Sequence, residues 1–339
     1  MTKNAKVGRQ APKSDEPASQ RAPQSVDKVV LITLITQWLT FFLAVAILLG
    51  TIGYMVFNGI QQSQKADQLT TEVAGWPYPK AKVELEQAIR YNKELAAKPK
   101  SERIIGDVMD GDASYARKDK EYMGMLNADS IGSMGSVEIP KISVKIPIHH
   151  TTDARALADG AGHLYGSSLP AGNKGSHSVI SAHSGEIDAL LFTRLHELKK
   201  GDFFYLRIMG GVQGYKVNDI RVIQPDDFSY FYTSDPHKAI VTLLTCTPIG
   251  INTQRLLVTG VRAKIPMPIP DPDTQSDPVY FWGAIAAGIL LIAVIIWFTH
   301  RLRAQRRSRY AHSSAHHLSS YAAHSSFDLE GYKPPRRER

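Results

Sequence analysis

Two long apolar runs without charge constrain the fold of this 339-residue chain more than any other feature. Residues 29–57 and 279–299 contain no Asp, Glu, Lys or Arg, and each is as long as the roughly 20 residues that a helix needs to cross a bilayer. Both carry Tyr or Trp near their ends, where aromatic side chains sit at the membrane interface. A buried core helix is the alternative for either run, and a cleaved signal peptide for the first. We predict two transmembrane helices, because the first run continues well past its cleavage-like Ala-Val-Ala at 44–46.

The distribution of charge predicts how these helices are oriented. The net charge is +8, of which residues 1–28 contribute +3 and residues 300–339 contribute +6. Basic flanks of membrane spans stay in the cytoplasm, so both tails are expected there, in contact with anionic membrane lipid. Residues 58–278 are then extracellular, in a two-pass protein of the cell membrane. They are close to neutral and have no basic stripe, so nucleic-acid binding is not predicted.

Composition divides the rest of the chain into segments. Residues 1–28 form a polar tail that is expected to be disordered, and residues 300–339 form a basic cytoplasmic tail. Residues 264–278 are rich in proline, which is typical of a stiff, extended spacer between a domain and a membrane. Residues 58–134 form a helical N-terminal region, in which apolar spacing and turn residues predict helices at 61–73, 80–99 and 114–127.

Residues 135–263 have the pattern of a mainly β domain. Short runs such as "SVEIP", "FFYLRIM" and "RLLVTGVR" alternate with turns rich in Gly, Pro, Asn and Asp. Seven or eight such strands in about 130 residues predict a closed barrel or a sandwich. One inserted helix is predicted at 190–202, ending at Gly201.

Cys246 is the only cysteine of the chain, so it cannot form a disulfide within its own chain. A lone extracellular thiol is tolerated, bridges to another chain, or reacts. A reactive thiol needs a histidine or a positive charge nearby, because only about a few per cent of an ordinary thiol is ionised at neutral pH. A hairpin between strands at 238–246 and 255–262 would bring Arg255 close enough to hold a substrate carbonyl or an oxyanion. An ordinary surface arginine is the alternative.

The residues alone do not select a histidine partner for Cys246. His183 has one advantage, because it ends the run "SVISAH" and precedes Ser184 and Gly185, where a strand passes into a loop. For any single histidine a structural role is favoured over a catalytic one, and no H-x-x-x-H or paired-cysteine spacing predicts a metal site. The segment between the apolar runs contains seven histidines: His149, His150, His163, His177, His183, His196 and His237.

The stretch "TLLTCTPIGINTQRLLVTGVR", residues 242–262, resembles the active-site region of sortases, the membrane-bound cysteine transpeptidases of Gram-positive bacteria. The family signature T-L-x-T-C falls on Thr242 to Cys246, the family arginine on Arg255, and the family histidine on His183. The stretches "VEIPKISVKIPI", "GAGHLYGSSLP" and "LFTRLHELKKGDFFYL" are similar to class C, the pilus-assembling sortases. The resemblance covers about residues 100–263 and implies a sortase-type β-barrel preceded by helices.

The resemblance also implies a reaction. Cys246 would attack the Thr carbonyl of an LPxTG-like sorting signal and form a thioester, with His183 moving the protons and Arg255 holding the oxyanion. The acyl group would pass to a lysine amine of another pilin subunit, and no metal or cofactor is required. Thr245 is a further candidate for substrate binding, with an ordinary strand residue as the alternative.

Three positions depart from the family pattern. Class C sortases usually carry a lid marked by Asp-Pro and an aromatic residue, but here only Asp110 or Asp112 with Tyr115 could take that part. Of these, Asp112 and Tyr115 are the preferred lid residues. Ser184 stands where Arg is frequent, and Ile249 stands where Tyr is common.

Alternatives remain for the function. The same thioester could be transferred to a cell-wall precursor, which would anchor surface proteins, or to water, as in a protease. A non-catalytic membrane adhesin or scaffold is the alternative of a different class.

Overall fold

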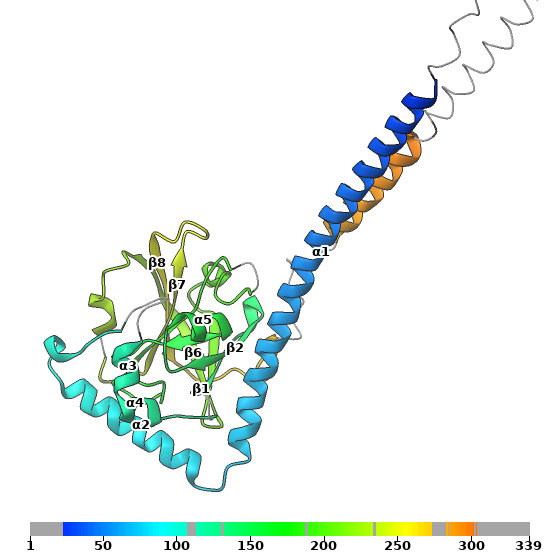
Figure 1. The fold of residues 1–339 in the computed structure, drawn as a ribbon. Coiled ribbons are helices and arrows are strands. Elements are labelled where there is room, and N and C mark those ends of the chain that lie inside the picture. Colours follow the sequence, from blue (N-terminus) through cyan, green and yellow to red (C-terminus); the bar gives the residue numbers. More distant parts are fainter. Residues whose placement is uncertain are drawn as a thin grey trace, which may run out of the picture. The chain divides into compact units, whose positions relative to one another are not determined.

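The computed structural model describes residues 23–106, 113–129, 132–186, 189–232 and 235–272, and most of 283–303. The chain forms two compact units, one ending at Asp273 and the other beginning at Thr274. Strands and helices of the first unit are shown in Figure 1. The predicted tail at 300–339 lies outside the described residues except at its beginning.

Helix α1, Pro23–Ala74, is a single helix of 52 residues that joins the first apolar run to the folded domain. Large apolar side chains are exposed along 31–60, as expected for a segment that faces lipid. The last turns are different, because Gln62, Ala66, Leu69 and Val73 form a buried stripe at helical spacing. This stripe packs against strands β1 and β2 (Figure 1). The helix predicted at 61–73 is thus the continuation of the helix that contains the first apolar run.

Two shorter helical segments follow. Helix α2, Lys80–Ala97, is attached to the barrel by Asn92, whose side-chain amide binds the main chain of Leu169 in both directions, at 2.7 and 2.9 Å. The helix predicted at 114–127 is divided into α3, Ser114–Lys118, and α4, Lys120–Gly124. The break falls at Asp119, because its carboxylate accepts a hydrogen bond from Tyr122 N and caps the second helix.

Eight strands form a closed barrel, one of the two architectures that the β-rich runs predicted and the one that the sortase resemblance implied. Their order around the barrel is β1-β2-β3-β4-β7-β8-β6-β5, and β5 pairs with β1 to close it. Short β3 escaped prediction because three residues are too few to show an alternating pattern. The strands are β1 Ser133–Ile139, β2 Val144–His149, β3 Ala161–His163, β4 His177–Ser181, β5 Phe203–Ile208, β6 Gly211–Ile223, β7 Ile240–Thr247 and β8 Gln254–Arg262.

Apolar side chains from all sides of the barrel fill its interior, among them Val137, Leu206, Leu243 and Val258. Each fully buried side chain of this size contributes about 1.5–3 kcal/mol to folding. A short helix, α5 Ala154–Asp159, connects β2 to β3. The remaining helical turns are single 3₁₀ turns at Lys100–Glu102, Pro140–Ile142, Leu195–Glu197 and Ser229–Tyr232.

The prediction of a helix at 190–202 is wrong. Only Leu195–Glu197 form a helical turn. Leu191 has a φ of 39°, which an α-helix cannot accommodate, and Phe192 N is held instead by the main-chain oxygen of His183 at 3.0 Å. Phe192 and Leu195 are fully buried, so core packing decides the path of this segment.

In the second unit, Ile285–Arg301 form an apolar helix. Among the described residues, α1 is the one helix long and apolar enough to cross a membrane. The prediction of two transmembrane helices is therefore supported for the first run alone, since residues 279–282 of the second lie outside the described part of the chain.

Candidate active site

Three neighbouring strands bring the predicted catalytic segments together. Strand β4 pairs with β7 in parallel, and β7 pairs with β8 as an antiparallel hairpin. In the hairpin, Cys246 lies directly opposite Arg255. Side chains of opposed residues project from the same face of a sheet with Cβ atoms about 5 Å apart. The sequence prediction that the hairpin brings these two residues side by side is confirmed.

His183 follows strand β4 by two residues. The parallel register pairs Ile180 with Leu243 and Ser181 with Leu244. Two more residues along both strands, the same register sets His183 beside Cys246. The two segments remain hydrogen-bonded beyond the last strand pair, because Ala182 N donates to Leu244 O at 3.1 Å. The barrel therefore places Cys246 opposite Arg255, and the β4–β7 register, continued by two residues, predicts that His183 lies in the same row.

Burial changes sharply at this row. Leu243, Leu244 and Thr245 are buried on β7, whereas Cys246 is half-buried and Pro248 is exposed. Arg255 is also half-buried, and so is His183. A reacting thiol needs this border position, because a substrate must reach it while the strands still hold it in place.

The guanidinium of Arg255 is fixed by the loop that joins β7 to β8. Its Nη1 lies 3.1 Å from both Asn252 O and Gln254 O and donates to these carbonyls. Its Nε is buried and has no hydrogen-bond partner among the residues that the structure describes. This N–H is a donor that a substrate carbonyl could satisfy, since a buried donor without a partner costs about 1–3 kcal/mol.

Two neighbouring groups contact the ring and the main chain of His183. The carboxylate of Glu186 is 3.9 Å from His183 Nδ1. The His183 carbonyl accepts from Phe192 N at 3.0 Å. Packing of Phe192 in the core thus holds the main chain of the histidine.

The other predicted site residues have different surroundings. Thr245 is buried, and its hydroxyl donates to Ala182 O at 2.8 Å, so its hydrogen is already used within the protein. Its role in substrate binding stays a prediction. Tyr115 lies on α3 with half of its surface exposed, and it lines a small cavity together with Gly106 and Thr151. Asp112 lies outside the described residues, so the lid also stays a prediction.

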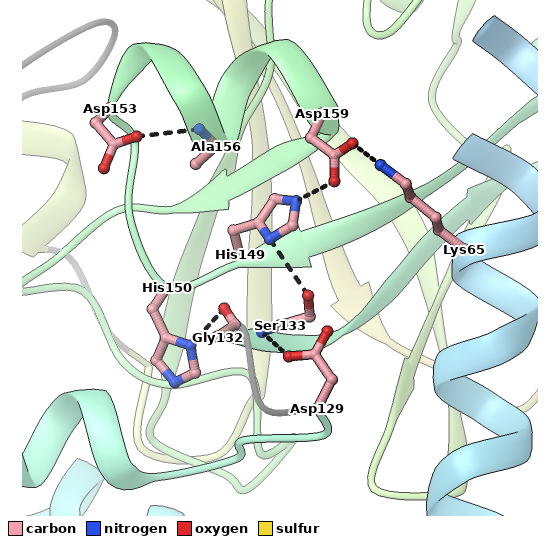
Figure 2. A network of polar contacts seen from close by, with 9 residues as sticks. All are labelled: Lys65, Asp129, Gly132, Ser133, His149, His150, Asp153, Ala156 and Asp159. Carbon is pink, nitrogen blue, oxygen red and sulfur yellow. Dashed lines mark hydrogen bonds and ion pairs between the residues drawn. The ribbon is translucent and has the colours of Figure 1, made fainter. Parts of the chain in front are cut away.

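Three other histidines belong to a polar network at the ends of β2 and β3, part of which Figure 2 shows. We call His149, His150 and His163 the buried histidines. His150 has Gly132 O at 2.8 Å from one ring nitrogen and Met125 O at 2.6 Å from the other. His163 Nε2 lies 2.8 Å from Ser168 O. Main-chain oxygens thus occupy both ring nitrogens of His150 and one of His163, which proton transfer to a substrate would need.

Burial sets the protonation of this network. It lowers the pKa of His150, and it lowers the pKa of the fully buried His163 to about 4. His149 lies 3.2 Å from the carboxylate of Asp159, which also pairs with Lys65 of α1. Its hydrogen bond with His149, and then the Lys65 charge, lower the pKa of Asp159 to about 2. The network links α1, α5 and β2 through these side chains. No local sequence pattern predicted it.

Around this network a cavity of about 700 Å³ opens between α1, α3 and α5. Its charged side chains are largely paired with one another, as in the ion pair of Arg117 with Asp153 at 2.7 Å. Within the described part of the chain, no group of three or more His, Cys, Asp or Glu side chains is arranged to hold a metal ion.

Comparison with known proteins identifies the family of this barrel. Residues 137–263 match the model of the sortase domain. The solved structure of sortase C from Streptococcus pneumoniae is 34% identical with a TM-score of 0.52, and the match covers 61% of this chain and 100% of that one. The chain belongs to the sortase family.

Sortase C1 from Streptococcus agalactiae is similar to the same degree, with 33% identity and a TM-score of 0.52 over 60% of this chain and 100% of that structure. These sortases are of class C, so the class resemblance predicted from the sequence is confirmed. Sortase D of Bacillus subtilis is 34% identical over 131 residues, 38% of this chain and 63% of that protein. The chain thus matches less than two thirds of this curated sortase.

Proposed function

We propose that this protein is a cysteine transpeptidase that joins pilin subunits through a thioester on Cys246. One observation carries the proposal. The only cysteine of the chain lies at the exposed end of a buried strand, directly opposite Arg255. The parallel register of β4 and β7, continued by two residues, supports a position for His183 on its other side. A nucleophile, a proton carrier and a cationic donor within one row are the parts that acyl transfer needs.

In the first step, the thiolate of Cys246 attacks the Thr carbonyl carbon of an LPxTG-like sorting signal. The carbonyl oxygen becomes an oxyanion, which Arg255 stabilises through its charge and its unpartnered Nε–H. The bond from this carbon to the following nitrogen then breaks. His183 protonates the leaving amine, and the acyl group remains on sulfur as a thioester.

In the second step, an amine replaces sulfur. His183 takes a proton from the incoming amine, whose nitrogen attacks the thioester carbon and expels the Cys246 thiolate. The product is an amide, and the protons exchanged at His183 balance over the cycle. The acceptor we propose is a lysine amine of another pilin subunit. Support comes from the class C relatives, among them the S. pneumoniae sortase C, for which pilin substrate specificity is described.

The membrane position follows from the charge of the tails and from α1. We propose that α1 and the helix that includes Ile285–Arg301 both cross the cell membrane, with both tails cytoplasmic and the barrel outside. The barrel would then work where secreted pilin precursors emerge, and the basic tails would contact anionic lipid.

A purified pilin with an LPxTG-like signal tests the reaction. The proposal predicts a ladder of covalent multimers with the full-length protein and none with Cys246→Ala. Products that are only hydrolysed, or that form only with a cell-wall precursor, would leave the thioester step intact and overturn the pilin acceptor. A ladder formed by Cys246→Ala would overturn the thioester on Cys246. No product from either protein would favour a non-catalytic adhesin or scaffold.

A further inference from the structure

Ser184, the residue after His183, makes a hydrogen bond that reaches the nucleophile's own main chain. Its hydroxyl donates to Cys246 O at 2.7 Å, and the residue is only 5% exposed. Strand β4 has already ended at Ser181, three residues earlier. A side chain therefore replaces the main-chain ladder at the point where the two strands would otherwise separate.

This bond belongs to a series of three that crosses from the β4 segment to β7. Ala182 N donates to Leu244 O, Thr245 Oγ1 donates to Ala182 O, and Ser184 Oγ donates to Cys246 O. The first two precede His183 in the chain and the third follows it. His183 is thus held to β7 on both of its sides.

The chain turns away directly after Ser184. Gly185 has a φ of 79°, a left-handed conformation that favours glycine, and its N–H donates to Thr193 Oγ1 rather than to β7. A Cβ at this position would also lie 3.0 Å from Ile249 of the β7–β8 loop. Ser184 therefore makes the last hydrogen bond that fixes the histidine segment against the strand of Cys246.

We propose that Ser184 is a positioning residue, whose hydroxyl keeps His183 in register with Cys246. This rests on the proposed function, in which His183 exchanges protons with groups at the thiol. Proton transfer requires heavy atoms within hydrogen-bond reach, and a displacement of about 1 Å can reduce the rate about a hundredfold. Without the hydroxyl, the segment after Ser181 keeps its two earlier bonds but can move at His183.

The test compares the full-length wild-type protein with two variants in detergent, using a sorting-signal peptide and a lysine-containing acceptor peptide. Ser184→Ala removes the hydroxyl. Ser176→Ala is the matched control, because Ser176 is equally buried, lies just before β4, and donates to the main-chain oxygen of Asn173 at 2.5 Å. We expect Ser184→Ala to lower kcat about tenfold with KM nearly unchanged, and Ser176→Ala to keep the wild-type kcat.

A second background separates positioning from general support of the fold. In His183→Ala there is no imidazole to position, so adding Ser184→Ala is expected to change the residual rate of peptide cleavage less than twofold. An equal loss of rate in both backgrounds would overturn the positioning role. Wild-type kcat in Ser184→Ala would overturn it as well.

If Ser184→Ala fails to fold, the isosteric pair Ser184→Thr and Ser184→Val tests the same point, because the two side chains differ only in the hydroxyl. The proposal predicts a higher kcat for the Thr variant, and equal values would overturn it. The outcome for the proposed function is separate, since it depends on whether Cys246→Ala is inactive.

Discussion

The histidine beside Cys246 and the buried histidines show how one barrel uses the same side chain in two ways. His150 and His163 are buried, and main-chain oxygens lie within 2.8 Å of their ring nitrogens. His183 is half-buried, follows a strand, and lies in the row of Cys246 and Arg255. A histidine whose ring nitrogens contact main-chain oxygens stabilises the fold, whereas a histidine at a strand end can exchange protons with a substrate.

The largest effect is expected at the strand end. Replacement of His183 by Ala should lower turnover about 10²–10⁴-fold, because the leaving amine loses its general acid. The free energy of unfolding should change by only about 1 kcal/mol, a typical value for a single substitution, although the side chain is largely buried. Peptide kinetics and thermal unfolding of the same sample measure both quantities. If His183→Ala lost stability but kept the wild-type turnover, His183 would be a structural histidine and not a catalytic one.

The next effect is a pH dependence that originates in the buried histidines. Burial lowers the pKa of His163 to about 4 in the folded protein, whereas the unfolded chain takes up this proton near pH 6.5. As pH falls, the unfolded state binds the proton first. The contribution of His163 to the free energy of unfolding is therefore complete above pH 6.5 and is lost between about pH 6.5 and 4. The loss is about 3 kcal/mol.

Unfolding by denaturant at several pH values measures this loss. His163→Gln serves as the comparison, since glutamine does not titrate, and its stability should depend less steeply on pH across the same window. Identical slopes in the two proteins would show that other groups are responsible.

A smaller effect is expected from the tyrosine that joins two of the buried histidines. The Tyr122 hydroxyl donates to His150 O at 2.6 Å and lies 2.8 Å from His163 Nδ1. Tyr122→Phe should lower the free energy of unfolding by about 1–3 kcal/mol, because these buried groups lose their partner. Turnover per folded molecule should stay at the wild-type value. Loss of turnover without loss of stability would tie the network to catalysis.

The smallest effect is expected where the network reaches α1. Lys65 is half-exposed, so Lys65→Met should change stability by no more than about 1 kcal/mol. The pKa of Asp159 should rise in this variant, because the Lys65 charge helps to lower it. NMR titration of the carboxyl group measures that rise, and an unchanged value would mean that His149 alone holds the carboxylate.

The sequence predicted the two halves of this comparison unequally. Cys246 and Arg255 could be placed together because a short hairpin joins them, and antiparallel neighbours are close in sequence. His183 follows a strand that pairs in parallel with β7, about 63 residues farther along the chain, so no spacing identified it and only the family resemblance did. The bonds of Ser184 and Tyr122 span 62 and 28 residues and left no local pattern.

The sequence predicted secondary structure well where an alternating pattern continued over several residues. It predicted less where the packing of buried side chains determines the path of the backbone. Alternating runs predicted the β-rich domain. The helix expected at 190–202 does not form, because Phe192 is buried in the core and Leu191 has a positive φ. The division of 114–127 depended on the Asp119 cap, which competes with a continuous helix.

Mass spectrometry of the trapped enzyme tests the central claim most directly. The full-length protein is mixed with a sorting-signal peptide without an acceptor amine, quenched in acid, and digested. The account predicts that the peptide containing Cys246 gains the mass of the acyl fragment, and that hydroxylamine removes it, as it does for a thioester. An acyl fragment on any other residue, or sorting-signal cleavage by Cys246→Ala, would contradict the account.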